Sequence, residues 1–143
     1  MMRAVVDASV AAKWCMPATR ETLVQQAENL LVSYLSGEIE FFVPDLFWIE
    51  LANVLWKAVS RNEIDSNRAE RAYLKVWEMD IPTLPSSETV SRALQLAVLN
   101  RRSVYESVYV ALALACQAEL ITADERLANA LAARFPVKWL GAF

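Results

Sequence analysis

The stretch that decides the fold class is SVYESVYVALALACQAELITAD, residues 103–124. It opens with Ser103 and Glu106 in the S-x-x-E spacing of a helix capping box, and the run that follows to Cys116 is almost uncharged. Residues 119–122 are typical of a short strand, after which Asp124 opens another helix. Helices alternating with short apolar strands indicate an α/β domain whose parallel sheet is covered on both faces.

The rest of the chain continues this alternation, and no linker, repeat or low-complexity segment interrupts it. Further strands are expected at residues 2–6, 41–43, 81–84 and 137–140. The strand at 81–84 is expected to be short or at an edge, because Pro82 cannot donate to a neighbouring strand. Pro44 is expected to open the helix that carries Leu46 to Val59. The remaining helices are expected at residues 9–16, 21–35, 65–79, 87–99 and 124–133. A single domain accounts for residues 1–143.

The composition excludes several kinds of enzyme. The 143 residues include no histidine, which removes Ser-His-Asp and Cys-His catalysis and zinc sites of the HExxH type. Two glycines are too few for a Gly-rich phosphate loop. The formal net charge of −3 differs from the basic balance of many nucleic-acid binders, but a metal ion can supply positive charge where a phosphate sits. Catalysis therefore rests on carboxylates, Lys, Tyr, Ser or Thr, or on a metal held by oxygen.

The cysteines and the hydropathy pattern favour a cytoplasmic protein. Cys15 and Cys116 lie in apolar helical surroundings and are expected to be free buried thiols rather than a disulfide. No signal peptide opens the chain, since Asp7 and Lys13 interrupt the short apolar stretch there. No run of about 18 apolar residues exists, so no membrane span is expected.

Two acidic residues are expected at the carboxyl ends of strands, where open parallel sheets form their sites. Asp7 directly follows the strand at residues 2–6, and Asp124 follows Thr122 by two positions. Each is also well placed as the N-cap of the next helix, so either residue alone fits a cap as well as a metal ligand. Because both would lie on the same rim of the sheet, the pair favours a shared site.

Two glutamates extend this set. Glu50 lies in an otherwise apolar helix, and burying a carboxylate there is costly unless a cation or a donor meets it. Asn53 would stand beside Glu50 on the same face and hold it by a hydrogen bond; the alternative is a solvent-exposed Glu50. Glu106 stands at the start of an uncharged helix, where it would face a cleft, although the capping box accounts for it equally well.

Three or four carboxylates on one rim, with no histidine, suit a hard divalent cation such as Mg²⁺ or Mn²⁺. Such a cluster repels itself when empty, so metal binding is expected to stabilise the fold. The reaction that fits is metal-assisted phosphodiester hydrolysis, in which the cation lowers the pKa of a bound water and a carboxylate orients that water.

Four segments resemble the signature segments of PIN domains, and the similarity is closest to VapC-like toxins. In chain order they are residues 5–9 (VVDAS), 50–55 (ELANVL), 104–113 (VYESVYVALA) and 120–127 (LITADERL). The resemblance covers the chain from about residue 3 to 140. It implies a three-layer α/β/α fold around a central parallel sheet of about four to five strands, and a Mg²⁺- or Mn²⁺-dependent ribonuclease. It also implies the toxin of a type II toxin–antitoxin pair, frequently a homodimer and often neutralised by a small antitoxin.

Carried over to this chain, the resemblance gives a set of site residues. The catalytic and metal-binding positions are Asp7, Glu50, Glu106 and Asp124. The supporting polar positions are Ser9, Asn53 and Thr122. Glu106 departs from the family pattern, because most relatives carry Asp in a Tyr-Asp-Ala setting where this chain has Tyr105-Glu106-Ser107. Glu keeps the charge but extends the carboxylate by one methylene, so catalytic efficiency or metal preference is expected to differ.

Basic residues that would line the approach to the cleft are candidates for contacts with RNA phosphates. They are Lys13, Arg101 and Arg102, with Lys57 and Arg61. The pair just before Glu106 is the best placed of them, whereas lone surface charges more often serve solubility.

An aromatic stripe, Trp48, Ala52 and Trp56, recurs at helical spacing on a helix whose other face is also apolar. Two interpretations stay open for it. The helix is either wrapped by the core on both sides, or it offers an interface to a second subunit or an antitoxin helix.

Three functions fit these residues. The first is an RNA-cleaving enzyme of the toxin kind. The second is a PIN-fold module that binds RNA or protein with weak or no catalysis, for which Glu106 is the clue. The third is another Mg²⁺-dependent phosphoryl-transfer enzyme on an α/β scaffold, since a fold does not fix a substrate. Metal binding without turnover would favour the second, and cleavage of nucleotides or sugar phosphates but not RNA would favour the third.

Overall fold

The computed structural model describes residues 1–143, except for the side chain of Arg20. Within this part of the chain, five strands form one parallel sheet in the order β3-β2-β1-β4-β5. The strands are β1 (Met2–Val6), β2 (Ile39–Pro44), β3 (Thr83–Leu84), β4 (Glu119–Thr122) and β5 (Val137–Trp139). The prediction of a parallel sheet with four to five strands and a short edge strand is confirmed.

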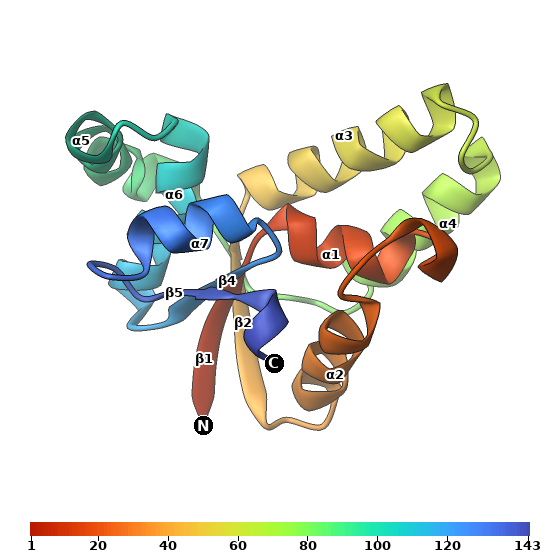
Figure 1. Ribbon diagram of the computed structural model, residues 1–143, viewed down its shortest axis with the longest axis horizontal. Helices are drawn as coiled ribbons and strands as arrows, with labels where there is room; N and C mark the ends of the chain where they lie inside the picture. The colour runs from red at the N-terminus through yellow and green to blue at the C-terminus, as the bar shows by residue number, and fades with distance from the viewer.

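Helices cover both faces of this sheet, which completes the three-layer arrangement (Figure 1). They are α1 (Ala8–Cys15), α2 (Val24–Leu35), α3 (Leu46–Ser60), α4 (Ser66–Trp77), α5 (Val90–Asn100), α6 (Val104–Cys116) and α7 (Glu125–Leu131). α1 and α2 lie on one side of the sheet, and α3 and α4 pack on α1. On the other side α6 packs on the central strands, α5 packs outside α6, and α7 contacts β4 and β5.

The core lies where the central strands meet α6. Residues 4–6 of β1 are fully buried, as are Leu120 and Ile121 of β4, so these strands are apolar on both faces as central parallel strands must be. On α6 every residue from Ser107 to Ala113 is buried, which explains why this helix carries almost no charge. Burial of each large apolar side chain here stabilises the fold by about 1.5–3 kcal/mol.

The strand order fixes where a site can form. The chain runs from β1 outward to β2 and β3 on one side, and then returns to β4 and β5 on the other. Val6 pairs with Ile121, so β1 and β4 end side by side. In open α/β sheets the crevice at such a reversal is the usual ligand site, because the connections there diverge to opposite faces.

Three predicted boundaries are wrong. Pro44 is the last residue of β2 and not the first of a helix, since it pairs with Leu84 of the edge strand. α2 begins at Val24 rather than at Glu21, because Leu23 before it adopts a left-handed backbone conformation (φ 60°). Residues 86–88 form a separate 3-10 turn, so α5 begins only at Val90. The remaining ends match the prediction or differ from it by one or two residues, and β5 is followed by a 3-10 turn after Trp139.

The predicted thiols are confirmed, since Cys15 and Cys116 are both buried and free. Burial raises the pKa of the Cys15 thiol to about 11. No helix in the described residues has the length and apolar character that crossing a membrane requires.

The aromatic stripe on α3 is not wrapped by the core. Leu51 and Leu55 are buried, but Ala52 and Trp56 are exposed, Trp56 with 63% of its surface. Trp48 is half-buried and packs edge-on against Tyr73 and Trp77 of α4. The interpretation of a helix buried on both sides is therefore wrong, and this face of α3 is an open apolar surface.

Candidate functional site

The four predicted carboxylates line one pocket at the carboxyl ends of β1 and β4. The pocket has a volume of about 160 Å³ and is bordered by Asp7, Ser9, Glu50, Glu106, Tyr109 and Asp124, together with Ala8 and Leu127. Asp7 follows β1, Glu50 lies on α3, Glu106 in the first turn of α6, and Asp124 follows β4. Four segments that are distant in sequence thus meet at the reversal of strand order.

Asp7 is both a helix cap and a pocket residue. Its Oδ1 accepts hydrogen bonds from the Ser9 amide (3.0 Å) and from the Ser9 hydroxyl. That hydroxyl in turn accepts from the Ala123 amide at 3.0 Å, so it ties the end of β1 to the end of β4. Burial raises the pKa of the Asp7 carboxyl to about 6, although hydrogen bonds from Ser9 and Thr122 act in the opposite direction.

Asp124 plays the same double part on the neighbouring strand. Its Oδ1 accepts from the amides of Arg126 (3.0 Å) and Leu127 (3.2 Å) and caps α7. Its own amide donates to the hydroxyl of Thr122 at 3.0 Å. Thr122 is fully buried, and its hydroxyl also forms a hydrogen bond with the Asp7 side chain. One side chain therefore contacts both aspartates. Ser9 and Thr122 therefore lie where supporting residues were predicted.

Glu50 is held from another helix. Its Oε1 accepts a hydrogen bond of 2.5 Å from the hydroxyl of Tyr109 on α6, and Tyr109 is only 4% exposed. Burial raises the pKa of Glu50, as does the negative charge of Glu106, while the bond from Tyr109 lowers it. Burial and the nearby Glu50 also raise the pKa of Tyr109, which keeps the phenol a neutral donor.

The prediction that Asn53 holds Glu50 is wrong. Asn53 is exposed, and among the described residues the identified partner of Glu50 is Tyr109. Tyr109 was not predicted as a site residue, because it lies in the almost uncharged run of α6 that the sequence indicates as core. A signal was present: a buried tyrosine needs a partner for its hydroxyl, and Tyr109 lies three positions after Glu106, on the same side of the helix.

Both carboxylate oxygens of Glu106 are contacted by residues that lie three and four positions before it. Oε1 lies 3.2 Å from the Ser103 hydroxyl, and Oε2 lies 2.7 Å from a terminal guanidinium nitrogen of Arg102. The Glu106 amide donates to Ser103 Oγ at 3.1 Å, so Ser103 is the predicted N-cap of α6. Glu106 therefore lines the pocket and also belongs to the N-cap of α6, although its side chain meets the Ser103 hydroxyl and not the Ser103 amide of a full capping box.

The basic candidates differ in their availability. Lys13 forms an ion pair with Glu21 at 2.8 Å, and Arg102 forms one with Glu106. Both side chains therefore already have an acidic partner. Arg101 is exposed at the C-cap of α5, and Lys57 and Arg61 are exposed near the end of α3. The predicted contacts of all five with RNA stay predictions.

The donor set fits a hard divalent cation in its chemistry, because it offers carboxylate oxygens around a small polar cavity. As the side chains stand, however, no three acidic or cysteine groups of the described residues converge enough to hold one ion. The reason is local: each of the four carboxylates turns toward a donor of the protein. In Glu50 and Asp124 these bonds fall on one oxygen, which leaves the other for a ligand.

The chain is similar to known proteins over most of its length. The family model described as PIN domain matches residues 4–131. Ribonuclease VapC3 of Pyrobaculum aerophilum is 32% identical over 130 residues, which are 90% of this chain and 94% of that protein.

Three solved structures share the fold. PAE2754 of Pyrobaculum aerophilum superposes with a TM-score of 0.72 at 20% identity, over 99% of this chain and 85% of its own. The toxin VapC20 of Mycobacterium tuberculosis, which cleaves the sarcin-ricin loop, gives 0.66 at 15% identity over 92% and 95%. The complex VapBC2 of Rickettsia felis bound to a promoter DNA fragment gives 0.65 at 8% identity over 96% and 98%.

Proposed function

Because the chain belongs to the PIN-domain family, we propose that it is a divalent-metal-dependent endoribonuclease, the toxin of a type II toxin–antitoxin pair. The observation that carries the proposal is the meeting of Asp7, Glu50, Glu106 and Asp124 around one pocket at the reversal of strand order. The identity of 32% with a ribonuclease over nearly the whole of both chains supports the same activity. A toxin of this kind acts in the cytoplasm, where its RNA target is.

Asp7, Glu50 and Asp124, with Glu106, would hold the cation, and Mg²⁺ or Mn²⁺ suits oxygen ligands of this type. When bound, the cation supplies the positive charge that activates a water and stabilises the leaving oxygen of a phosphodiester. The protein contributes the order of the site. Ser9 and Thr122 fix the two aspartates on the rim, and Tyr109 fixes Glu50 between two helices.

The substrate would approach over the N-terminal end of α6. Arg101 is exposed there and can meet an RNA phosphate without losing another partner. Arg102 and Lys13 would have to leave Glu106 and Glu21 before they bind RNA. Arg101 is therefore the strongest of the three predicted RNA-binding residues.

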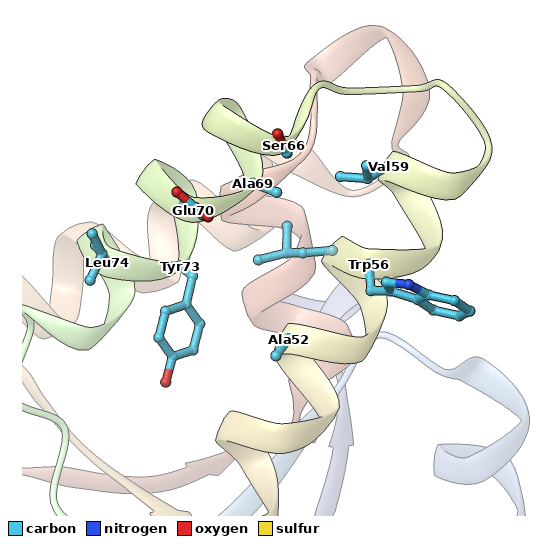
Figure 2. Close-up of a pocket in the computed structure, with 9 residues that line it drawn as sticks. Ala52, Trp56, Val59, Ser66, Ala69, Glu70, Tyr73 and Leu74 are labelled. Atoms are coloured by element: carbon cyan, nitrogen blue, oxygen red, sulfur yellow. The ribbon is translucent and has the colours of Figure 1, made fainter.

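We propose that an antitoxin partner binds between α3 and α4. The open face of α3 and the facing side of α4 form an apolar groove of about 520 Å³, lined mainly by Ala52, Leu55, Trp56, Val59, Ala69 and Tyr73. In Figure 2 Val59 and Ala69 point toward each other across the gap between the two helices, and Tyr73 closes one end. A groove between two helices fits the apolar face of an amphipathic helix, which is the occupant we propose. The acidic Glu70 at the groove suits a basic residue of that helix.

The groove is tested by Trp56→Glu, with Val32→Glu as the control. Both side chains are exposed and apolar on helices, Trp56 by 63% and Val32 by 63%, but Val32 lies on α2 outside the groove. Co-expression with a candidate antitoxin should yield a complex with wild type and with Val32→Glu, and not with Trp56→Glu. A complex with all three proteins would contradict the assignment of the groove.

A second copy of the chain would bind elsewhere. α5 carries Val90, Leu94, Val98 and Leu99 on its outer face, exposed by between 45% and 77%. Three of them recur at four-residue spacing and form a stripe, and large apolar stripes on a surface helix mark interfaces. We infer a homodimer through α5, for which Leu94→Glu should convert dimer to monomer in analytical ultracentrifugation.

Cleavage of a mixed set of labelled RNAs tests the activity itself. Wild type is assayed with Mg²⁺, Mn²⁺ and EDTA beside Asp7→Asn and Glu106→Gln. We expect cutting that needs the metal and is lost in Asp7→Asn. Loss in Glu106→Gln as well would make Glu106 a working part of the site, whereas retention would reduce it to a cap. Metal binding by wild type without any cutting would favour the binding-module alternative, for which Glu106 in place of Asp is the supporting observation.

A further inference from the structure

The contact between Arg102 and Glu106 sets one of the four carboxylates apart. Its N–O distance of 2.7 Å is that of a charge-assisted hydrogen bond, and the side chains are 25% and 33% exposed, so the pair is partly shielded from water. Arg102 and Glu106 are four residues apart but span the junction between α5 and α6, where Arg101 takes a left-handed conformation (φ 52°). This turn brings the guanidinium back over the first turn of α6.

The pair occupies the oxygens that a cation would use. Oε2 is taken by Arg102 and Oε1 is met by Ser103, and both bonds come from the residues just before Glu106. Glu50 and Asp124 differ, because the hydrogen bonds to each fall on one oxygen. Each Glu106 oxygen keeps a second lone pair, but the Arg102 guanidinium holds Oε2 at 2.7 Å and places a positive charge beside it, so a shared ion would bind Glu106 at the expense of this contact.

We propose that Arg102 is a positioning residue that holds Glu106 in the metal-free protein and yields it to the divalent cation, so that the ion pair and the metal complex compete for one carboxylate. The proposal rests on the proposed metal-dependent function. It assigns the extra methylene of Glu106 a use, since the longer side chain contacts Arg102 while it lines the pocket. It also accounts for Arg102 Nε, which is buried without a hydrogen-bond partner in the described structure: a guanidinium held by a single carboxylate oxygen is incompletely satisfied and can be released.

Competition between Arg102 and the ion predicts the direction in which the Kd for Mn²⁺ changes when Arg102 is replaced. If Glu106 must leave Arg102 before it binds the ion, removing the guanidinium makes binding tighter. Partly exposed ion pairs stabilise by amounts equivalent to about a two- to fivefold change in an equilibrium constant. Arg102→Gln is therefore expected to lower the Kd for Mn²⁺ by about two- to fivefold, and Arg102→Lys, which keeps a cation beside Glu106, to lie near wild type.

The experiment is a calorimetric titration of the purified chain with Mn²⁺ in the absence of RNA. Arg101→Gln is the matched control, because it removes the same charge one residue away from an exposed side chain, and its effect on Kd is expected to stay below about 1.5-fold. Thermal unfolding in EDTA verifies that each variant is folded. The decisive arm repeats Arg102→Gln in a Glu106→Gln background, where the gain in affinity should vanish.

Two results would overturn the proposal while leaving the nuclease intact. One is a Kd for Arg102→Gln that matches the Arg101→Gln control. The other is a gain in affinity that persists with Glu106→Gln, which would make Arg102 a source of general repulsion rather than a partner of Glu106. Failure of wild type to bind Mn²⁺ at all would instead contradict the metal-dependent function, and the proposal with it. The expected pattern is tighter binding with Arg102→Gln that needs Glu106.

Discussion

Replacing Asp7 by Asn is expected to stabilise the metal-free protein at pH 8 although it removes the activity. The Asp7 side chain is buried, with 8% exposure, and burial raises its pKa from 3.8 to about 6. A carboxyl with a raised pKa binds its proton more tightly in the folded state than in the unfolded state. The stability is therefore full below about pH 4, falls as the pH rises through about 6, and stays reduced above it.

The magnitude follows from the pKa difference. About two pKa units at about 1.4 kcal/mol each give a destabilisation of about 3 kcal/mol by the ionised Asp7 at pH 8. Asn carries no charge to desolvate and caps a helix as well as Asp does, so the Ser9 amide keeps its acceptor. Its amide group is a new buried donor, which costs about 1–2 kcal/mol if it is poorly paired. The net gain is about 1–2 kcal/mol, or about 3–6 °C in Tm for a chain of this length.

The assay is thermal unfolding followed by circular dichroism in EDTA at pH 8 and pH 4.5. Asp65→Asn is the control, since Asp65 is an exposed N-cap of α4 outside the pocket. We expect Asp7→Asn to melt above wild type at pH 8 and to lose this advantage at pH 4.5, while the control melts like wild type at both. The reasoning is refuted if Asp7→Asn melts no higher than wild type at pH 8, or if its gain is the same at both pH values.

The remaining predictions concern the metal, Tyr109 and the core. Mn²⁺ should raise the Tm of wild type and not that of Asp7→Asn, measured by the same unfolding assay, because the ion relieves the burial of a charge that the variant lacks. Tyr109→Phe should lower RNA cleavage by about tenfold and the free energy of unfolding by about 1 kcal/mol, because Glu50 loses its donor; Tyr105→Phe, whose side chain is 66% exposed, should change neither. Leu112→Ala should lower the free energy of unfolding in urea by about 2–5 kcal/mol, because it leaves a cavity between α6 and the core. Leu114→Ala, whose side chain is 37% exposed, should lower it much less. Equal losses would contradict the packing of this helix.

The fold could be predicted because its signals are local. The strand at residues 119–122 and the N-cap at Ser103 are encoded by neighbouring residues, and both are confirmed. The prediction of Pro44 as the start of a helix failed because a pairing between distant residues determines the structure there. Pro44 belongs to β2 because of its register with Leu84, forty residues away, and the local preference of proline for a helix start cannot reveal that.

The same distinction divides the site. Asp7 and Asp124 could be placed because a parallel sheet brings the ends of its strands to one rim, and no contact had to be known. Tyr109 could not be placed, since its partner Glu50 lies 59 residues earlier and the two meet only through the packing of α3 near α6. The prediction that Asn53 holds Glu50 was wrong for the same reason. Helical spacing puts Asn53 near Glu50, but the tertiary fold leaves its side chain in solvent. The exposure of Trp56 likewise depends on what α4 leaves uncovered.

Capping and metal binding were alternatives in the sequence, and the structure shows why they need not exclude each other. A carboxylate has two oxygens, and an N-cap needs one. Asp124 gives Oδ1 to two amides of α7, which leaves Oδ2 without a role in the helix. Local hydrogen bonds of this kind let the protein fold with an acidic pocket before any ion arrives, since each charge is met by a donor. The same bonds turn the side chains away from a common centre, so the cation must compete with the protein for its ligands. Where the competing partner is a backbone amide the second oxygen is spared, but at Glu106 it is an arginine, and there the competition is direct.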